Sequence, residues 1–333
     1  MPAYNEATES RLRAWRDSLS ELLVILNDEP SFMSMEDLRA GYTAMLTGHP
    51  APDGITVENV MMGATPAKLV TPTDYIPGRT LLYFHGGAYL FGSAEGYVAL
   101  GGRLALALKS QVYIPHYRLA PEHPYPTPIL DCVDSYEWLL SQGVDPRGIV
   151  FSGDSAGGAL TVSVMMHARD RGLPLPAGGA AISPWVEIAN QGQSMRTRAG
   201  IDPLCTQAAL DIQARAFLGG ARATSPDASP VYADLRGLPP MLVQVGEAEV
   251  MLSGAIDLSI RLGEHRVRSS LEIWPDMFHV WHMFAAVLPE GQRAIDGLAR
   301  FLDDALREAS SRGAADPLTL MAVIASPQAR TSK

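Results

Sequence analysis

A serine with the surroundings of a nucleophile lies near the middle of the chain. Ser155 is the centre of a Gly-x-Ser-x-Gly pattern at 153–157, which follows an apolar run at 148–152 and precedes a helical stretch at 158–171. In such a strand–turn–helix junction the serine stands above the sheet at a helix N-terminus, where backbone N–H groups favour developing negative charge. Glycines are needed on both sides because a side chain there would collide with the neighbouring helix or strand. The pattern predicts a nucleophile for acyl transfer; a tight glycine turn with an incidental serine is the alternative.

A pair of glycines directly follows another apolar run, at 80–84. The segment 85–89 reads His-Gly-Gly-Ala-Tyr. Acyl transfer passes through a tetrahedral intermediate, and its oxyanion needs hydrogen-bond donors that are already in place. We expect the backbone N–H groups of Gly86, Gly87 and Ala156 to be these donors. An ordinary Gly-Gly turn is the alternative, and the nearby serine pattern makes it the weaker one.

Three motifs together resemble one known family. The segments 85–88, 117–126 and 153–158 (His-Gly-Gly-Ala, Tyr-Arg-Leu-Ala-Pro-Glu-His-Pro-Tyr-Pro and Gly-Asp-Ser-Ala-Gly-Gly) are similar in order and spacing to motifs of the hormone-sensitive-lipase family of bacterial and fungal esterases. The resemblance extends from about residue 78 to about residue 305. It implies an α/β-hydrolase fold and a carboxylesterase activity. The family more often has a third glycine where this chain has Ala88, and we expect the oxyanion hole to be retained.

The general base is expected near the C-terminus. α/β-hydrolases order their triad as serine, acid, histidine, so the histidine follows the last strand, predicted at 271–274. The segment 275–282 contains two histidines and resembles the histidine loop of the family. This match assigns the base to His279, whose imidazole can take a proton and return it near neutral pH. His282 begins the next helical stretch and is interpreted as a packing or pocket residue.

The acid that orients the imidazole is expected just beyond the strand predicted at 241–245. In the family an aspartate usually occupies this turn, whereas this chain offers Glu247 and Glu249. Glu249 matches the family offsets better, because it precedes Met251 by two residues and His279 by 30. Glu247 stays open as the alternative; otherwise it is a solvated charge in the turn.

Four side chains beside these motifs are candidates for the substrate pocket: Ala88, Tyr89, Asp154 and Trp185. Plain packing is the alternative for the two aromatic residues. In the family, the position of Asp154 often orders a neighbouring loop. His85 is expected to orient the oxyanion loop without reacting.

Alternating strands and helices position these residues. Apolar runs predict strands at 57–61, 68–71, 80–84, 111–115, 148–152, 180–183, 241–245 and 271–274. Helical patterns lie at 97–109, 128–141, 157–171, 252–263 and 290–309. This alternation predicts an α/β fold with a mostly parallel central sheet and helices on both faces.

Two further segments are expected to form a helical cap over the sheet. Residues 1–50 contain apolar residues at steps of three and four, and Ser34 precedes Asp37 by three as in a capping box. The interval 184–229 breaks the strand–helix alternation and contains one clear helix, predicted at 205–218. The hydrolase core then comprises 51–183 and 230–312, and 313–333 is predicted to be a loosely ordered tail.

Composition narrows the class of protein. The chain has 333 residues, 47% of them apolar, and a formal net charge of −10, which disfavours nucleic acid as a partner. Its two cysteines are too few for a disulfide framework and lack metal-ligand spacing. The N-terminus lacks the pattern of a secretory signal, and no apolar stretch is long enough to span a bilayer. We therefore expect a cytoplasmic protein with no membrane span, no metal and no cofactor; the sequence leaves both a monomer and a homodimer open.

These features predict a serine carboxylesterase. It would hydrolyse short- to medium-chain carboxylic esters, or a lactone, through an acyl-enzyme intermediate, with a small-molecule ester as its partner. One alternative is a lyase on the same scaffold, because a fold does not determine a reaction. The other is a non-catalytic receptor for a small ligand, against which the presence of both Ser155 and His279 argues.

Overall fold

The computed structural model describes residues 4–26 and 34–314. Two helices, α1 (Glu6–Leu26) and α2 (Met35–Thr47), precede the first strand. The predicted capping box is confirmed: the Ser34 hydroxyl accepts from the Asp37 N–H (3.1 Å), and the Asp37 carboxylate accepts from the Ser34 N–H (3.1 Å). The last helix runs to Ala314, and the rest of the tail predicted at 313–333 lies outside the described residues.

In the part of the chain that the structure describes, the sheet has eight strands in the order β1-β2-β4-β3-β5-β6-β7-β8. They are β1 (Ile55–Met62), β2 (Thr65–Pro72), β3 (Thr80–Phe84), β4 (Gln111–Pro115), β5 (Ile149–Asp154), β6 (Gly178–Ile182), β7 (Met241–Gly246) and β8 (Ser269–Trp274). β2 is antiparallel to β1 and β4, and the pairs from β4 to β8 are parallel. The prediction of a mostly parallel sheet is confirmed.

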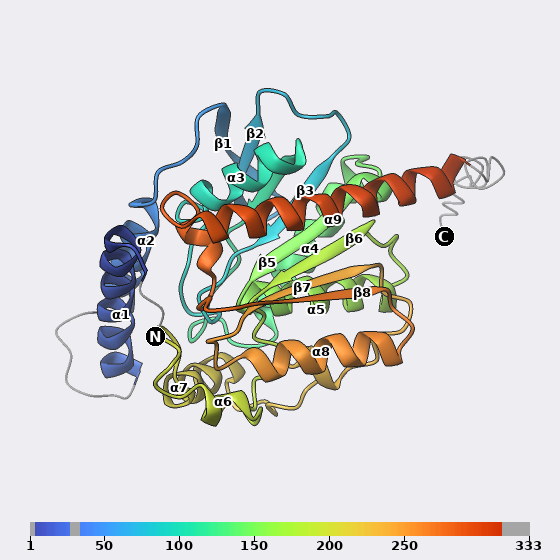
Figure 1. Ribbon diagram of the computed structural model, residues 1–333. Helices are drawn as coiled ribbons and strands as arrows, with labels where there is room; N and C mark the ends of the chain where they lie inside the picture. The colour runs from blue at the N-terminus through green and yellow to red at the C-terminus, as the bar shows by residue number, and fades with distance from the viewer. Residues whose placement is uncertain (1–3, 27–33, 315–333) are drawn as a thin grey trace, which may run out of the picture.

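Helices cover both faces of this sheet (Figure 1). They are α3 (Val98–Leu108), α4 (Thr127–Ser141), α5 (Ala156–Asp170), α8 (Leu252–Glu264) and α9 (Pro289–Ala314). Side chains alternate along β3: Leu82 packs in the core with α4, α5 and α8, whereas Leu81 packs with α3 and α9. Every residue of β3 is buried because both of its faces are covered, which explains why its sequence is a continuous apolar run.

The segments outside this layered core gather at one end of the sheet. Figure 1 shows α1 and α2 there together with α6 (Ser194–Thr197) and α7 (Gln207–Leu218), and α1 packs on both α2 and α7. The helix predicted at 205–218 begins at Gln207, because the hydroxyl of Thr206 accepts from the Ala209 N–H (3.2 Å) and caps it. None of the helices in the described ranges has the length and apolar character needed to cross a membrane.

Candidate active site

Ser155 lies in the turn between β5 and α5. Its φ of +54° and ψ of −118° form a sparsely populated backbone conformation, which agrees with the strained turn that the sequence predicts. The flanking glycines have no room for a side chain: a Cβ at Gly157 would meet the carbonyl oxygen of Phe84, and one at Gly153 would meet that of Gly157. The steric reason predicted for both glycines is therefore confirmed.

His279 follows β8 and pairs with a buried glutamate. Its Nδ1 lies 2.8 Å from Oε2 of Glu249, a side chain that is fully buried. The other oxygen of this carboxylate accepts from the Ser183 hydroxyl (2.7 Å) and from the Gly246 N–H (2.5 Å). Three partners thus hold Glu249 in place, and its bond to Nδ1 leaves Nε2 of His279 as the nitrogen that can exchange a proton with a substrate.

Glu247, the alternative acid, lies elsewhere. Its carboxylate forms an ion pair with Arg198 (2.8 Å) and its side chain is 43% exposed. The turn after β7 therefore turns Glu249 inward to His279 and leaves Glu247 on the surface. His282 is buried and bonds through Nε2 to Oε1 of Gln244 (2.9 Å), which fits the interpretation of a packing residue.

Asp154 orders the loop after β3. Its carboxylate accepts from the hydroxyls of Tyr83 (2.8 Å) and Tyr97 (2.9 Å) and from the N–H of Gly86 (3.0 Å). Burial raises the pKa of Asp154 to about 6, and these hydrogen bonds act in the opposite direction. Because the single N–H of Gly86 already points at this carboxylate, the prediction that Gly86 is an oxyanion donor is wrong.

The next two residues of the loop, Gly87 and Ala88, line a cavity that also contains Ser155 and His279. Both have positive φ, +109° at Gly87 and +55° at Ala88. At Gly87 a Cβ would meet the carbonyl oxygen of Phe91, so only glycine fits. The left-handed backbone conformation costs an alanine about 1–2 kcal/mol, whereas a glycine adopts it without this steric cost. A glycine at position 88 would therefore be less strained.

His85 supports this loop from behind. The ring is buried, stacks on Tyr117 with centroids 4.2 Å apart, and bonds through Nδ1 to the carbonyl oxygen of Gly86 (2.8 Å). Burial lowers the pKa of His85 to about 3, so the ring is neutral. These contacts agree with the orienting role that the sequence predicts.

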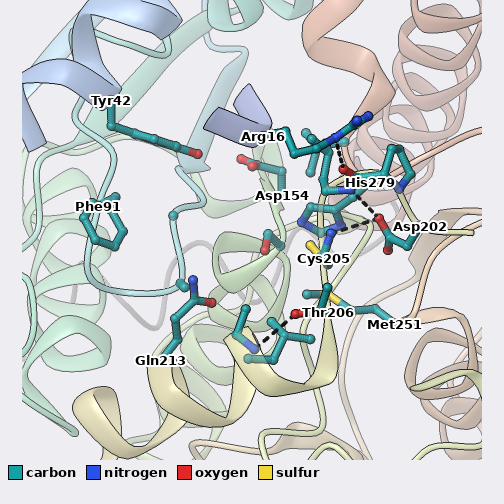
Figure 2. A pocket seen from close by; sticks show the side chains of 18 of the residues that line it. Arg16, Tyr42, Phe91, Asp154, Asp202, Cys205, Thr206, Gln213, Met251 and His279 are labelled. Atoms are coloured by element: carbon teal, nitrogen blue, oxygen red, sulfur yellow. Dashed lines mark hydrogen bonds between the residues drawn. The ribbon is translucent and has the colours of Figure 1, made fainter. Parts of the chain in front are cut away.

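The cavity has a volume of about 340 Å³, and Figure 2 shows side chains that line it. The loop after β3, the serine turn and the histidine loop form its floor. Arg16 of α1 and Tyr42 of α2 line it from one side. From another side it is lined by residues 202–206 and by Ala209, Leu210 and Gln213 of α7. Segments far apart in the sequence therefore enclose the serine and the histidine together.

Two predicted pocket residues lie outside this wall. Tyr89 is buried and stacks on Phe217, with ring centroids 3.7 Å apart. The ring of Trp185 is buried and donates through Nε1 to Asn190 (2.8 Å), while its backbone N–H donates to the carbonyl oxygen of Ser155 (3.0 Å). Both were predicted from their neighbours in sequence, but their rings pack into the core. Ala88 and Asp154 do line the cavity.

Asp202 also lines the cavity, although the only signal in the sequence is its place before a proline in a turn. It is buried and accepts from the backbone N–H groups of Leu204 (2.9 Å), Cys205 (3.0 Å) and Val250 (2.9 Å). The bond from the Val250 N–H connects the 184–229 insertion to the residue that follows Glu249.

The electrostatic surroundings favour a protonated His279. Burial acts to lower its pKa, but the hydrogen bond and negative charge of Glu249 outweigh burial, and Asp202 and Asp154 add to the same effect. The net result is a pKa above the ordinary 6.5. The imidazole is therefore well suited to receive a proton.

Replacing Asp202 with asparagine is expected to move the acid limb of kcat/KM to lower pH. A general base works only in its neutral form, so with His279 as the predicted base the activity rises with pH through the pKa of His279. The Asp202 carboxylate raises this pKa. Its removal therefore lowers the pKa of His279. The measurement is the pH profile of p-nitrophenyl acetate hydrolysis from about pH 5 to about pH 8. Asp211→Asn is the control, because Asp211 lies in the same insertion but bonds Asn190. A limb that stays in place or rises in the Asp202 variant contradicts the expectation.

Comparisons with known proteins identify relatives of this chain. A family model of the alpha/beta hydrolase fold matches residues 81–283. An acetyl-hydrolase from Streptomyces hygroscopicus is 41% identical over 261 residues, which cover 78% of this chain and 85% of that protein. The crystal structure of an esterase from the bacterial hormone-sensitive lipase family superposes with a TM-score of 0.85 at 37% identity and covers 92% of this chain and all of the other.

A second solved structure extends the likeness to a protein studied with a small ester. Crystals of the protein EstE5 were soaked with p-nitrophenyl butyrate, and that structure superposes with a TM-score of 0.79 at 38% identity, over 87% of this chain and 99% of the other. The fold and the relatives agree. The chain is a carboxylesterase that belongs to the hormone-sensitive-lipase family of α/β-hydrolases.

Proposed function

We propose that Ser155, His279 and Glu249 form the catalytic triad of a serine esterase. The observation that carries the proposal is the buried 2.8 Å bond between Glu249 and Nδ1 of His279, in a cavity that His279 shares with Ser155. His279 takes the proton of the Ser155 hydroxyl as the oxygen attacks the ester carbonyl. Glu249 keeps the imidazole in the tautomer that accepts through Nε2, and stabilises the cation that forms.

The oxyanion is held by three backbone N–H groups in this proposal: those of Gly87, Ala88 and Ala156. Gly87 and Ala88 line the cavity, whereas Gly86 donates to Asp154, so Ala88 takes the place of Gly86 in this set. Ala156 is the first residue of α5, so the helix dipole adds to its effect. The alcohol then leaves with the proton from His279, and a water molecule releases the acid by the same steps in reverse.

The helices α1 and α2 and the insertion 184–229 act as the cap of this site. They contribute apolar walls through Tyr42, Leu204 and Leu210, which suit a short to medium acyl group. The cavity measures about 340 Å³ and residues of both cap segments line it, a size that suits a short or medium acyl group better than a long one. The natural substrate is then a short- or medium-chain ester, or a lactone of similar size.

The test is the hydrolysis of p-nitrophenyl acetate, butyrate, hexanoate and decanoate. We expect kcat/KM to be highest for the short and medium chains and to fall by about tenfold or more at decanoate, because the added methylenes cannot enter the cavity. Rates that keep rising out to decanoate would contradict the size limit.

An organophosphonate separates the esterase from its alternatives. It forms a covalent bond with an activated serine oxygen, so mass spectrometry is expected to find the label on Ser155 together with loss of activity. A non-catalytic receptor stays unlabelled. An enzyme that is labelled but turns over no ester would point to a different reaction on the same scaffold.

A further inference from the structure

Gln213 is a buried polar side chain without a hydrogen-bond partner. It lies on α7, lines the cavity and is 7% exposed. Among the residues that the structure describes, no hydrogen bond to its carboxamide is found, although it offers one acceptor and two donors. The carboxamide is not sealed inside the protein but faces the cavity, so a molecule bound there can supply its hydrogen-bond partner.

Two other glutamines in the described part of the chain have protein partners for their amides. Gln244, which is fully buried, donates to Glu272 (2.8 Å) and to the carbonyl oxygen of Ala294 (3.1 Å), and it pairs with His282. Gln207, on the same helix as Gln213, donates to the carbonyl oxygen of Asn190 (3.0 Å). The unpaired amide therefore occurs where a substrate would supply the partner.

The position of Gln213 indicates which half of the ester it meets. Figure 2 shows its carboxamide directed into the cavity, on the side of Phe91 and away from His279. The leaving alcohol must lie next to His279, which protonates it, and so the acyl half extends away from the histidine. The wall around Gln213 includes Phe91, Ala209 and Leu210, which are apolar.

We propose that Gln213 determines specificity by binding a hydroxyl group on the acyl half of the ester. A hydroxyl both donates and accepts, which matches the carboxamide, and the apolar surroundings make this hydrogen bond strong. The enzyme then prefers hydroxyacyl esters to the unsubstituted ones. This inference rests on the triad proposed above, because the triad defines which half is the acyl half.

The test compares ethyl esters with and without the hydroxyl. Ethyl butanoate is paired with each enantiomer of ethyl 3-hydroxybutanoate, and ethyl hexanoate with its 3-, 5- and 6-hydroxy derivatives, all followed by pH-stat titration. In the wild type, we expect kcat/KM for a hydroxy ester to exceed that of its unsubstituted partner by about three- to tenfold, the value of one net hydrogen bond. In Gln213→Met, which keeps the volume and removes the amide, the ratio should fall to about one.

Gln207→Met is the matched control, because it removes the same amide from an exposed position of the same helix. It should keep both the ratio and the rate on ethyl butanoate. Labelling of Ser155 by an organophosphonate verifies that each variant has an intact site, and Gln213→Leu provides a second variant without the amide if the methionine variant is not labelled.

Two results would overturn the inference. One is a wild type that prefers none of the hydroxy esters while it hydrolyses the unsubstituted ones. The other is a preference that persists in a labelled Gln213 variant. Failure of the triad proposal is distinct from both, because the organophosphonate would then leave Ser155 of the wild type unlabelled, and the inference would fall with it.

Discussion

Replacing Glu249 with glutamine is expected to lower kcat for p-nitrophenyl butyrate by about 10⁴-fold. The glutamine is nearly the same size, but it cannot stabilise the imidazolium that forms when His279 takes the serine proton, and its NH₂ group can favour the wrong tautomer. Loss of the negative charge also lowers the pKa of His279, because Glu249 is its strongest raising influence. The remaining activity should therefore show an acid limb at lower pH than in the wild type.

Glu247→Gln is the matched control for this variant. It makes the same chemical change two positions earlier, in a carboxylate that pairs with Arg198 at the surface. Turnover within about twofold of the wild type is expected, since exposed ion pairs contribute little. If instead the Glu247 variant lost activity and the Glu249 variant kept it, the assignment of the acid would be reversed.

Ser155→Ala is expected to lower kcat on the same ester by about 10⁶-fold. The variant keeps the cavity and the His279–Glu249 pair but has no oxygen to form the acyl-enzyme, so neither acylation nor deacylation can proceed. The measurement is p-nitrophenol release by protein purified in parallel with the wild type. Labelling by an organophosphonate should disappear as well.

Folding must be separated from chemistry in this variant. The φ of +54° at position 155 strains alanine and serine alike, so we expect the midpoint of thermal unfolding to change little. A folded Ser155→Ala protein that retained substantial ester turnover would contradict the acyl-enzyme mechanism. It would favour a reaction in which His279 acts without a covalent intermediate.

The fold and the core of the site could be predicted from the sequence because their signals are local. β3 and β4 match the predicted bounds, since each is a short apolar run between turn residues. The glycines around Ser155 are required by contacts within one turn, and five residues suffice to indicate that turn. The order of triad residues in α/β-hydrolases predicts the histidine beyond the last strand, where His279 follows β8.

Only the tertiary structure determines the directions in which individual groups point. Glu247 and Glu249 lie in the same turn, and sequence offsets favour one without showing that it faces His279. The N–H of Gly86 points at Asp154, a residue 68 positions away, and no local pattern reveals that bond.

The same holds for side chains around the cavity. Tyr89 adjoins the oxyanion loop in sequence yet packs away from the cavity, whereas Asp202 and Gln213 come from an insertion without a motif and line it. Strand and turn formation depends on nearby residues, so sequence alone determined the scaffold and the turn that holds the proposed nucleophile. The walls of the site depend on contacts between distant segments, and these exist only once α1, α2 and α7 have packed over the end of the sheet.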